Sequence, residues 1–330
     1  MSRLLNALLY LVVRAGMTML QALPLPVVAR LGRAMGGLVW RFDARHRRVA
    51  EANLALCFGQ EKSSAELRLI ARENFRRLGE NFASAVKTAI MTPAQVRPHF
   101  DFIGAEKILA FKHASGPQSR IVAIGHFGNF ELFARFGQFI PVFKCATTYR
   151  GLDQPALNRL LQSLRERSGC RFFERRTDAA ALKEAMTDTG LLLGLLADQH
   201  AGDRGLRLPF FGHECSTSAA PAVFALRYHC PLHTAICYRT APAHWQIEVG
   251  DEIPTLVNGQ PRSIEDITRD INLAFEHAVR RDPANWFWVH KRWKPGKFRA
   301  NPPASVPSGV PPTGAASPSP LPPREGRGPG

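Results

Sequence analysis

Paired cysteines, acidic residues and long apolar runs are all scarce in this sequence of 330 residues. Its six cysteines include no CxxC pair, which argues against a disulfide framework and a cysteine-based zinc site. We therefore expect reduced thiols in a cytosolic compartment. Acidic residues number only 27 against 43 basic ones, and the formal net charge is +16. This excess indicates an anionic partner: nucleic acid, an acidic membrane surface or a phosphorylated substrate.

The apolar run nearest the N-terminus, "LLNALLYLVV", is too short for a clean membrane-spanning helix. On a helix at about 100° per residue, apolar side chains cover most of residues 3 to 22. One narrow polar stripe remains, made of Arg3, Tyr10, Arg14, Thr18 and Gln21. This pattern favours a helix that lies in a bilayer or dips into it, and a buried core helix is the alternative. Arginines in "RFDARHRR" (41–48) would suit anionic headgroups or form a solvated face.

Composition divides the chain into three parts. We expect residues 1–40 to form an apolar or amphipathic, membrane-anchoring helical region and residues 41–300 to form the main domain. Residues 301–330 hold so many prolines, glycines and serines that we expect a disordered tail. In the main domain a helix over 63–90, with Ser63 and Glu66 in capping-box spacing, precedes a series of short apolar strands that alternate with helices. The strands are "RIVAIG", "KCATTYR", "GLLLGLLAD" and "LHTAICYR", and the helices lie near 130–139, 155–168, 178–188 and 217–229.

This alternation predicts an α/β fold with a mixed, mostly parallel sheet covered by helices. "HWQIEVG" would add an edge strand, and residues 263–282 a late helix.

The stretch "IVAIGHFGNFELF" (121–133) reads as a strand, a tight turn and a helix. His126 follows the strand, Gly128 permits a conformation closed to other residues, and Asn129 is a natural N-cap. Glu131 then lies in the first helical turn, where the helix dipole favours a carboxylate. On one continuous helix the two side chains would point about 140° apart, so only a turn brings them together.

Bent back in this way, Glu131 would accept a hydrogen bond from the imidazole of His126. It would then fix the tautomer and stabilise the imidazolium that forms when histidine removes a proton. The pattern makes His126 a candidate general base with Glu131 as its orienting partner. An HxxxxE spacing is common by chance, and a single histidine is often structural.

"HFGNFE" resembles the HX4D/E block of glycerolipid acyltransferases, and in particular the HxGNWE form of the lipid A late acyltransferases, the lauroyl and myristoyl transferases. Phe130 stands where that family usually has tryptophan. Three further segments are similar to later blocks of the family, and "NWFWVHKRWK" to its usual ending. They are "TTYRGLDQPALNRLLQSLRERSG", "GLLLGLLADQHAGDRGLRLPFFG" and "STSAAPAVFALRYHCPLHTAICYR". The resemblance covers roughly residues 3 to 298, in order.

The resemblance implies a membrane-bound acyltransferase with a glycerolipid acyltransferase-like fold. It would move a fatty acyl chain from a thioester of acyl carrier protein or coenzyme A to a hydroxyl of a lipid A precursor. Its place would be the cytoplasmic face of the cell inner membrane, and it would need no cofactor and no acyl-enzyme. A lysophospholipid or other glycolipid acceptor is the alternative within this fold. A basic nucleic-acid-binding protein is the alternative among non-enzymes, but no recognition motif supports it.

Other candidate residues follow from the same blocks. Arg150 would bind a phosphate of the acceptor or the developing oxyanion. Asp198 and Gln199 would orient sugar hydroxyls or support Arg150, although Asp198 could also simply cap a loop. Asn158 is a further substrate-binding candidate.

Apolar and aromatic candidates complete the set. Phe210 and Phe211 would wall an acyl-chain channel or pack in the core. In "NWFWVHKRWK", three tryptophans beside Lys291, Arg292 and Lys294 would suit the headgroup zone, or simply pack. No zinc-ligand spacing joins His126, His200, His213 and Cys215, so we predict no metal site.

Overall fold

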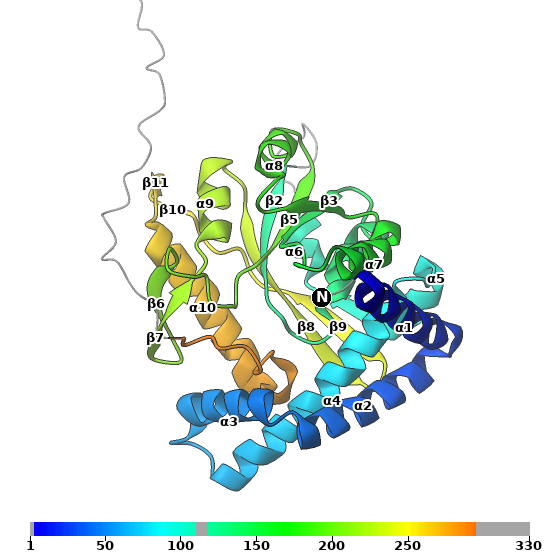
Figure 1. Ribbon diagram of the computed structural model, residues 1–330. Coiled ribbons are helices and arrows are strands. Elements are labelled where there is room, and N and C mark those ends of the chain that lie inside the picture. Colours follow the sequence, from blue (N-terminus) through cyan, green and yellow to red (C-terminus); the bar gives the residue numbers. More distant parts are fainter. Residues whose placement is uncertain (1–2, 110–117, 295–330) are drawn as a thin grey trace, which may run out of the picture. The chain divides into compact units, whose positions relative to one another are not determined.

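The computed structural model, which describes residues 3–109 and 118–294, is built on a seven-stranded sheet (Figure 1). The strand order is β1-β9-β8-β2-β5-β3-β4. The strands are β1 (Phe100–Ile103), β2 (Arg120–Ile124), β3 (Lys144–Tyr149), β4 (Arg171–Glu174), β5 (Leu191–Leu196), β8 (Leu232–Ala241) and β9 (His244–Val249). Two small ribbons lie apart from it: β6 (Leu206–Phe210) with β7 (His213–Thr217), and β10 (Leu256–Val257) with β11 (Gln260–Pro261). The tail predicted over 301–330 lies outside the described residues.

The sheet is mixed and mostly parallel, which confirms the predicted fold class. Strands β8, β2, β5, β3 and β4 pair in parallel, β9 runs antiparallel to β8, and β1 runs parallel to β9. The predicted edge strand "HWQIEVG" is β9, but it lies inside the sheet because β1 pairs with its outer side. The carboxyl ends of β2, β5 and β3 therefore meet at one edge.

Helices cover both faces of the sheet. They are α1 (Arg3–Ala22), α2 (Leu25–Phe42), α3 (Ala44–Phe58), α4 (Ser64–Thr88), α5 (Pro93–Val96), α6 (Ala105–Leu109), α7 (Pro155–Arg165), α8 (Ala179–Ala185), α9 (Ala220–Arg227) and α10 (Ile264–Arg281). Short 3-10 helices add η1 (Arg97–His99), η2 (Phe130–Gln138), η3 (Glu166–Ser168) and η4 (Pro283–Asn285). The predicted helices 63–90 and 263–282 are confirmed as α4 and α10, and the predicted Ser63–Glu66 capping box is present.

Side-chain alternation along the strands creates one core on each face. Ile121 and Ala123 of β2 join the core formed with α3, α4, α9 and α10. Val122 and Ile124 point the other way and join a second core with η2, β8 and β9. Because every residue of β2 is buried, this strand is a rigid support for whatever follows it.

Glycines allow α2 and α4 to cross backbone against backbone. Gly32 and Gly36 of α2 meet Gly79 of α4, and a Cβ added at any of the three would overlap the main chain of the other helix. Small residues spaced four apart permit this close approach. Contacts place these helices and the sheet in one unit, residues 1–298.

The N-terminal helix α1 lies against α4 and α7. Its outer side exposes Leu8, Leu11, Val12 and Met19, each by more than half of its surface. In the part of the chain that the structure describes, no helix combines the length and the hydropathy needed to cross a bilayer.

The helix crossing yields a stability prediction. Gly36→Ala forces a methyl group into the carbonyl of Phe75, so the free energy of unfolding should fall by about 1–3 kcal/mol. Gly37→Ala is the matched control, because its Cβ would meet only Arg76 Cγ at 3.9 Å. That variant should be stabilised by roughly 0.4–1 kcal/mol, since alanine loses less entropy on folding. Urea denaturation measures both, and equal stability of the two variants would contradict the packing.

Candidate active site

The central pair of the candidate site lies at the carboxyl edge of two neighbouring strands. His126 follows β2 and Asp198 follows β5, each two residues beyond the in-register pair Ile124 and Leu196. The backbone between β2 and η2 turns at Gly128, whose φ of +51° disfavours other residues. A Cβ at Gly128 would also press on the carbonyl group of Cys237. The predicted role of this glycine in the turn is therefore confirmed.

Asp198 holds the histidine at two points. The backbone N–H of His126 donates to Asp198 Oδ2 at 2.8 Å, and its Nδ1 lies 2.8 Å from Oδ1. Because an ionised carboxylate only accepts hydrogen bonds, Nδ1 carries the proton and Nε2 is left as the basic nitrogen. The side chain of His126 is 17% exposed, so the ring retains access to a substrate.

The carboxylate of Asp198 is completely buried. Burial alone would raise its pKa, but His126 and the indole N–H of Trp286, 2.9 Å from Oδ2, outweigh that effect and lower it. Asp198 is thus an anion held by three N–H donors. It has the orienting position that the sequence assigned to Glu131.

Glu131 pairs with an arginine instead of the histidine. Its Oε1 accepts from Arg165 Nη2 at 2.6 Å and its Oε2 from Arg165 Nε at 3.2 Å. This corrects the predicted hydrogen bond between Glu131 and His126. The physical reason is that the segment after Asn129 is a 3-10 helix without a side-chain cap, while the imidazole is already bound by a buried carboxylate. Both residues still line the same cavity.

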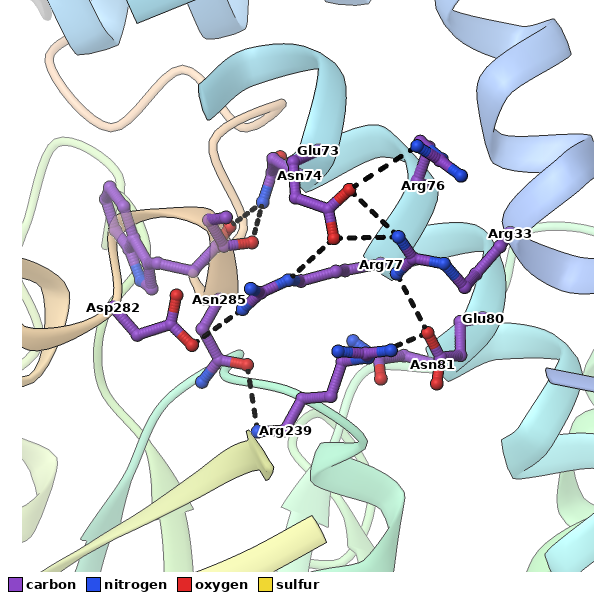
Figure 2. Close-up of polar contacts among 12 residues, drawn as sticks. Arg33, Glu73, Asn74, Arg76, Arg77, Glu80, Asn81, Arg239, Asp282 and Asn285 are labelled. Carbon is purple, nitrogen blue, oxygen red and sulfur yellow. Dashed lines mark hydrogen bonds and ion pairs between the residues drawn. The ribbon is translucent and has the colours of Figure 1, made fainter. Parts of the chain in front are cut away.

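The segment from Asp282 to Arg292 completes the site. The carbonyl of Asn285 accepts from the N–H of Gly128 at 3.1 Å, and its side chain donates to the carbonyl of Cys237 at 2.9 Å. One residue further, Trp286 reaches Asp198. Asn74 of α4 donates to the carbonyls of Ala284 and Trp286 and so anchors this segment from the other side (Figure 2).

Figure 2 shows the ion pairs that hold this segment against the N-terminal helices. Arg77 joins Glu73 at 3.1 Å and Asp282 at 2.6 Å. The fully buried Glu80 lies between Arg33 of α2, at 3.2 Å, and Arg239 of β8, at 2.8 Å. Moving one of these elements away would leave a buried charge without its partner, which is costly. The network therefore holds α2, α4, β8 and η4 in one arrangement.

A cavity of about 680 Å³ opens onto His126. Its polar lining includes His126, Glu131, Arg150, Arg165, Gln199 and His290. Its apolar lining comes from one face of the sheet, with Phe133 and Phe136 of η2 on the opposite side; the strand residues include Val122, Ile124, Leu192, Ala235 and Val249. The volume is that of an ordinary ligand site, and the lining joins a reactive polar end to an apolar space.

The structure separates the remaining candidates. Arg150 and Gln199 line the cavity, whereas Asn158 accepts a hydrogen bond from the N–H of Leu152 at 3.1 Å and fixes a loop. Phe210 and Phe211 lie in the core beside Phe58 and Trp286, outside the cavity lining, which corrects the expected channel wall.

Some expectations for the C-terminal segment also change. Trp286, Trp288 and Arg292 are almost fully buried and therefore pack in the fold, not in a headgroup zone. Arg165, Trp286 and His290 were missed as site residues; only the position of Arg165 at the end of a helix inside a family-like block could have signalled it. The described residues contain no group of three or more His, Cys, Asp or Glu that could hold a metal ion.

The chain is similar to known proteins over most of its length. The family model described as bacterial lipid A biosynthesis acyltransferase matches residues 2–295. The chain is 26% identical over 280 residues to a lipid A biosynthesis palmitoleoyltransferase of Escherichia coli K12, covering 82% of this chain and 86% of that protein. It is 26% identical over 277 residues to a lipid A biosynthesis lauroyltransferase of the same organism, covering 82% and 87%.

The buried carboxylate gives a prediction about pH. The folded pKa of Asp198 lies below the ordinary value near 4, so its ionisation stabilises the fold above that pH and the contribution disappears as pH falls through the folded pKa. Trp286→Phe removes one donor, which should cost about 1.5–3 kcal/mol at pH 7. It should also raise the pKa of Asp198, so that acid destabilisation begins at higher pH.

Trp288→Phe is the matched control for this pH prediction. Trp288 is equally buried, but its indole N–H donates to the carbonyl of Pro283 at 2.6 Å. Urea midpoints between pH 3 and 7 should therefore keep the wild-type pH profile in this variant. Identical profiles for both variants would show that Trp286 does not support the ionised carboxylate.

Proposed function

The chain belongs to the bacterial lipid A biosynthesis acyltransferase family, and we propose that it transfers a fatty acyl chain from a thioester of acyl carrier protein or coenzyme A to a hydroxyl of a lipid A precursor. The single observation that supports this chemistry best is the Asp198–His126 pair at the edge of a partly apolar cavity. His126 is the general base in this proposal. Asp198 takes the orienting role expected of Glu131.

The chemical step follows from this geometry. An alcohol is a weak nucleophile near neutral pH, so Nε2 of His126 removes its proton as the oxygen attacks the thioester carbonyl. Asp198 fixes the tautomer and stabilises the imidazolium. When the tetrahedral intermediate collapses, the carbon–sulfur bond breaks and the imidazolium returns its proton to the departing thiolate. No acyl-enzyme is required.

The pair formed by Glu131 and Arg165 supplies fixed charge on the cavity wall. The guanidinium of Arg165 is held by two bonds to Glu131 and lies over the ring of Phe172 at 4.9 Å. We propose that this guanidinium stabilises the negative charge that develops on the carbonyl oxygen, because a preorganised donor needs no reorganisation during the reaction. The apolar lining on the sheet face then accommodates the acyl chain, at about 0.8 kcal/mol for each buried methylene group.

The chemical step alone does not select the acceptor, since a lysophospholipid hydroxyl would undergo the same step. Lipid A is favoured because the two similar proteins are a lipid A biosynthesis palmitoleoyltransferase and a lipid A biosynthesis lauroyltransferase. Transfer to a lysophospholipid but not to a lipid A precursor would retain the mechanism and reject this acceptor.

Catalysis gives the next prediction. His126→Ala removes the base and should lower transfer by roughly 10²–10⁴-fold, measured from an acyl carrier protein thioester to a lipid A precursor. Asp198→Asn should be similarly impaired, and the double variant little worse than His126→Ala, because residues that act as a unit are not additive.

His213→Ala is the control for a histidine outside the cavity, and its turnover should be close to wild type. Circular dichroism checks the fold of each variant. Wild-type turnover in a folded His126→Ala protein would refute the mechanism.

We further propose that α1 and α2 hold the enzyme on the cytoplasmic face of the cell inner membrane. The support is the row of exposed apolar side chains on these helices, accompanied by arginines and the net charge of +16. Such a surface attaches to a bilayer without crossing it.

Membrane attachment is tested with substitutions at exposed residues only. The variant Leu11→Asp with Met19→Asp changes side chains that are 60% and 71% exposed, so the fold should remain intact. Its binding to anionic vesicles should fall at least tenfold, because each buried apolar side chain contributes about 1.5–3 kcal/mol. Leu69→Asp, at a leucine of α4 that is 65% exposed, should retain binding. Cosedimentation measures this, and unchanged binding of the double variant would place attachment elsewhere.

A further inference from the structure

Two arginines lie side by side at the carboxyl edge of the sheet. Arg150 follows β3 and Arg175 follows β4, and these strands pair in parallel with Tyr149 opposite Glu174. The two backbones are therefore about 4.8 Å apart at this edge, the usual spacing of neighbouring strands. Both side chains line the cavity that contains His126.

The two turns that carry these arginines are fixed to each other. The N–H of Arg175 donates to the carbonyl of Tyr149 at 3.0 Å, and the N–H of Gly151 donates to Glu174 Oε1 at 3.2 Å. Arg150 lies between these two cross-links. Asn158 holds the next residue of the loop, Leu152, so the backbone on both sides of the arginine pair is set before any ligand arrives.

The charges of the cavity wall are unbalanced at this place. Its lining contains Arg150, Arg165 and Arg175 but a single carboxylate, Glu131, which Arg165 already binds. Glu174 is also engaged, because it accepts from the N–H groups of Gly151, Arg176 and Thr177. Among the described residues, neither Arg150 nor Arg175 forms an ion pair with a carboxylate; Arg175 Nε donates to Thr148 Oγ1 at 3.3 Å.

We propose that Arg150 and Arg175 form a subsite for a phosphate ester, an inference that rests on the proposed function. The guanidinium groups of two neighbouring turns leave positive charge at this edge of the cavity, and each can make the planar, bidentate contacts that phosphate oxygens accept. The anion would neutralise them at the edge of the cavity.

The sheet order sets the place of this subsite relative to the reaction. Between β2, which carries His126, and β3 and β4 there are two and three strand spacings, about 10–15 Å. The phosphate is therefore not the reacting group. It anchors a distant part of a substrate, and that binding positions the hydroxyl or the thioester beside His126.

Two substrates carry such a group. One is a phosphorylated glycolipid acceptor, and the other is the thioester donor, in which a phosphodiester joins the acyl-bearing arm to its carrier. The same chemistry would serve either, so the experiment must vary the phosphate on each substrate separately.

The variants are Arg150→Gln, Arg175→Gln and their combination, with Arg176→Gln as control. Arg176 lies in the same turn and carries the same charge, but it does not line the cavity. Steady-state kinetics are measured for a bisphosphorylated lipid A precursor and its dephosphorylated form. The donors compared are an acyl-phosphopantetheine thioester and an acyl-pantetheine thioester, which differ only in the phosphate group.

We expect each Gln variant at Arg150 or Arg175 to raise KM about tenfold or more for the substrate whose phosphate is bound, with a smaller change in kcat. For wild-type enzyme, KM for that substrate should rise by a similar factor when the phosphate is removed. This comparison needs no mutation. The double variant should no longer distinguish the two forms of that substrate, whereas Arg176→Gln should. Which substrate shows the effect identifies the source of the phosphate.

Equilibrium binding of the same lipids to the full-length chain separates this inference from the proposed function. If wild type transfers acyl groups but neither substrate depends on its phosphate together with Arg150 and Arg175, the subsite is refuted and the function stands. If no transfer occurs but phosphorylated lipid binds through these arginines, the function is refuted and the subsite stands.

Discussion

The arrangement of the site depends on one buried carboxylate. Asp198 is withdrawn from water completely, and an ionised group in that position is tolerated only when donors replace its hydration. The donors come from separate parts of the chain, two from His126 and one from Trp286. The turn after β2, the end of β5 and the segment after α10 must therefore reach their final places together. The geometry that we propose for catalysis and the stability of the fold therefore depend on the same three hydrogen bonds.

The N-terminal helices contribute to that geometry from a distance. The glycine crossing brings α2 against α4 closely enough for Arg33 to reach Glu73 and Glu80. From α4, Arg77 and Asn74 continue to the segment that carries Trp286. Side chains thus connect the helices that we propose to rest on a bilayer with the histidine that we propose as the catalytic base. These side chains have few alternative arrangements. Because protein interiors are densely packed, a displacement of one of these elements would be transmitted to the elements packed against it.

The fold class and the edge that carries the site were predictable from the sequence, because short apolar runs that alternate with helices imply parallel strands ending together. The partner of His126 was not. Asp198 lies 72 residues away in sequence, and its place beside His126 depends on β5, not β3, being the neighbour of β2. Local spacing favoured Glu131, but a 3-10 helix replaced the expected capped turn. The buried position of Trp286 likewise depends on a hydrogen bond from Asn74, which no local sequence pattern predicts.

The late position of Asp282 to Arg292 has a consequence for biosynthesis. A ribosome makes β2 and β5 long before it makes this segment, so the emerging chain contains His126 and Asp198 without the third donor or the anchor of the Gly128 turn. Strand β2 also lacks its second neighbour, β8, until more than a hundred further residues have been made. A nascent chain interrupted before this point would have an exposed sheet edge, which makes such intermediates prone to aggregation and substrates for chaperones and proteases.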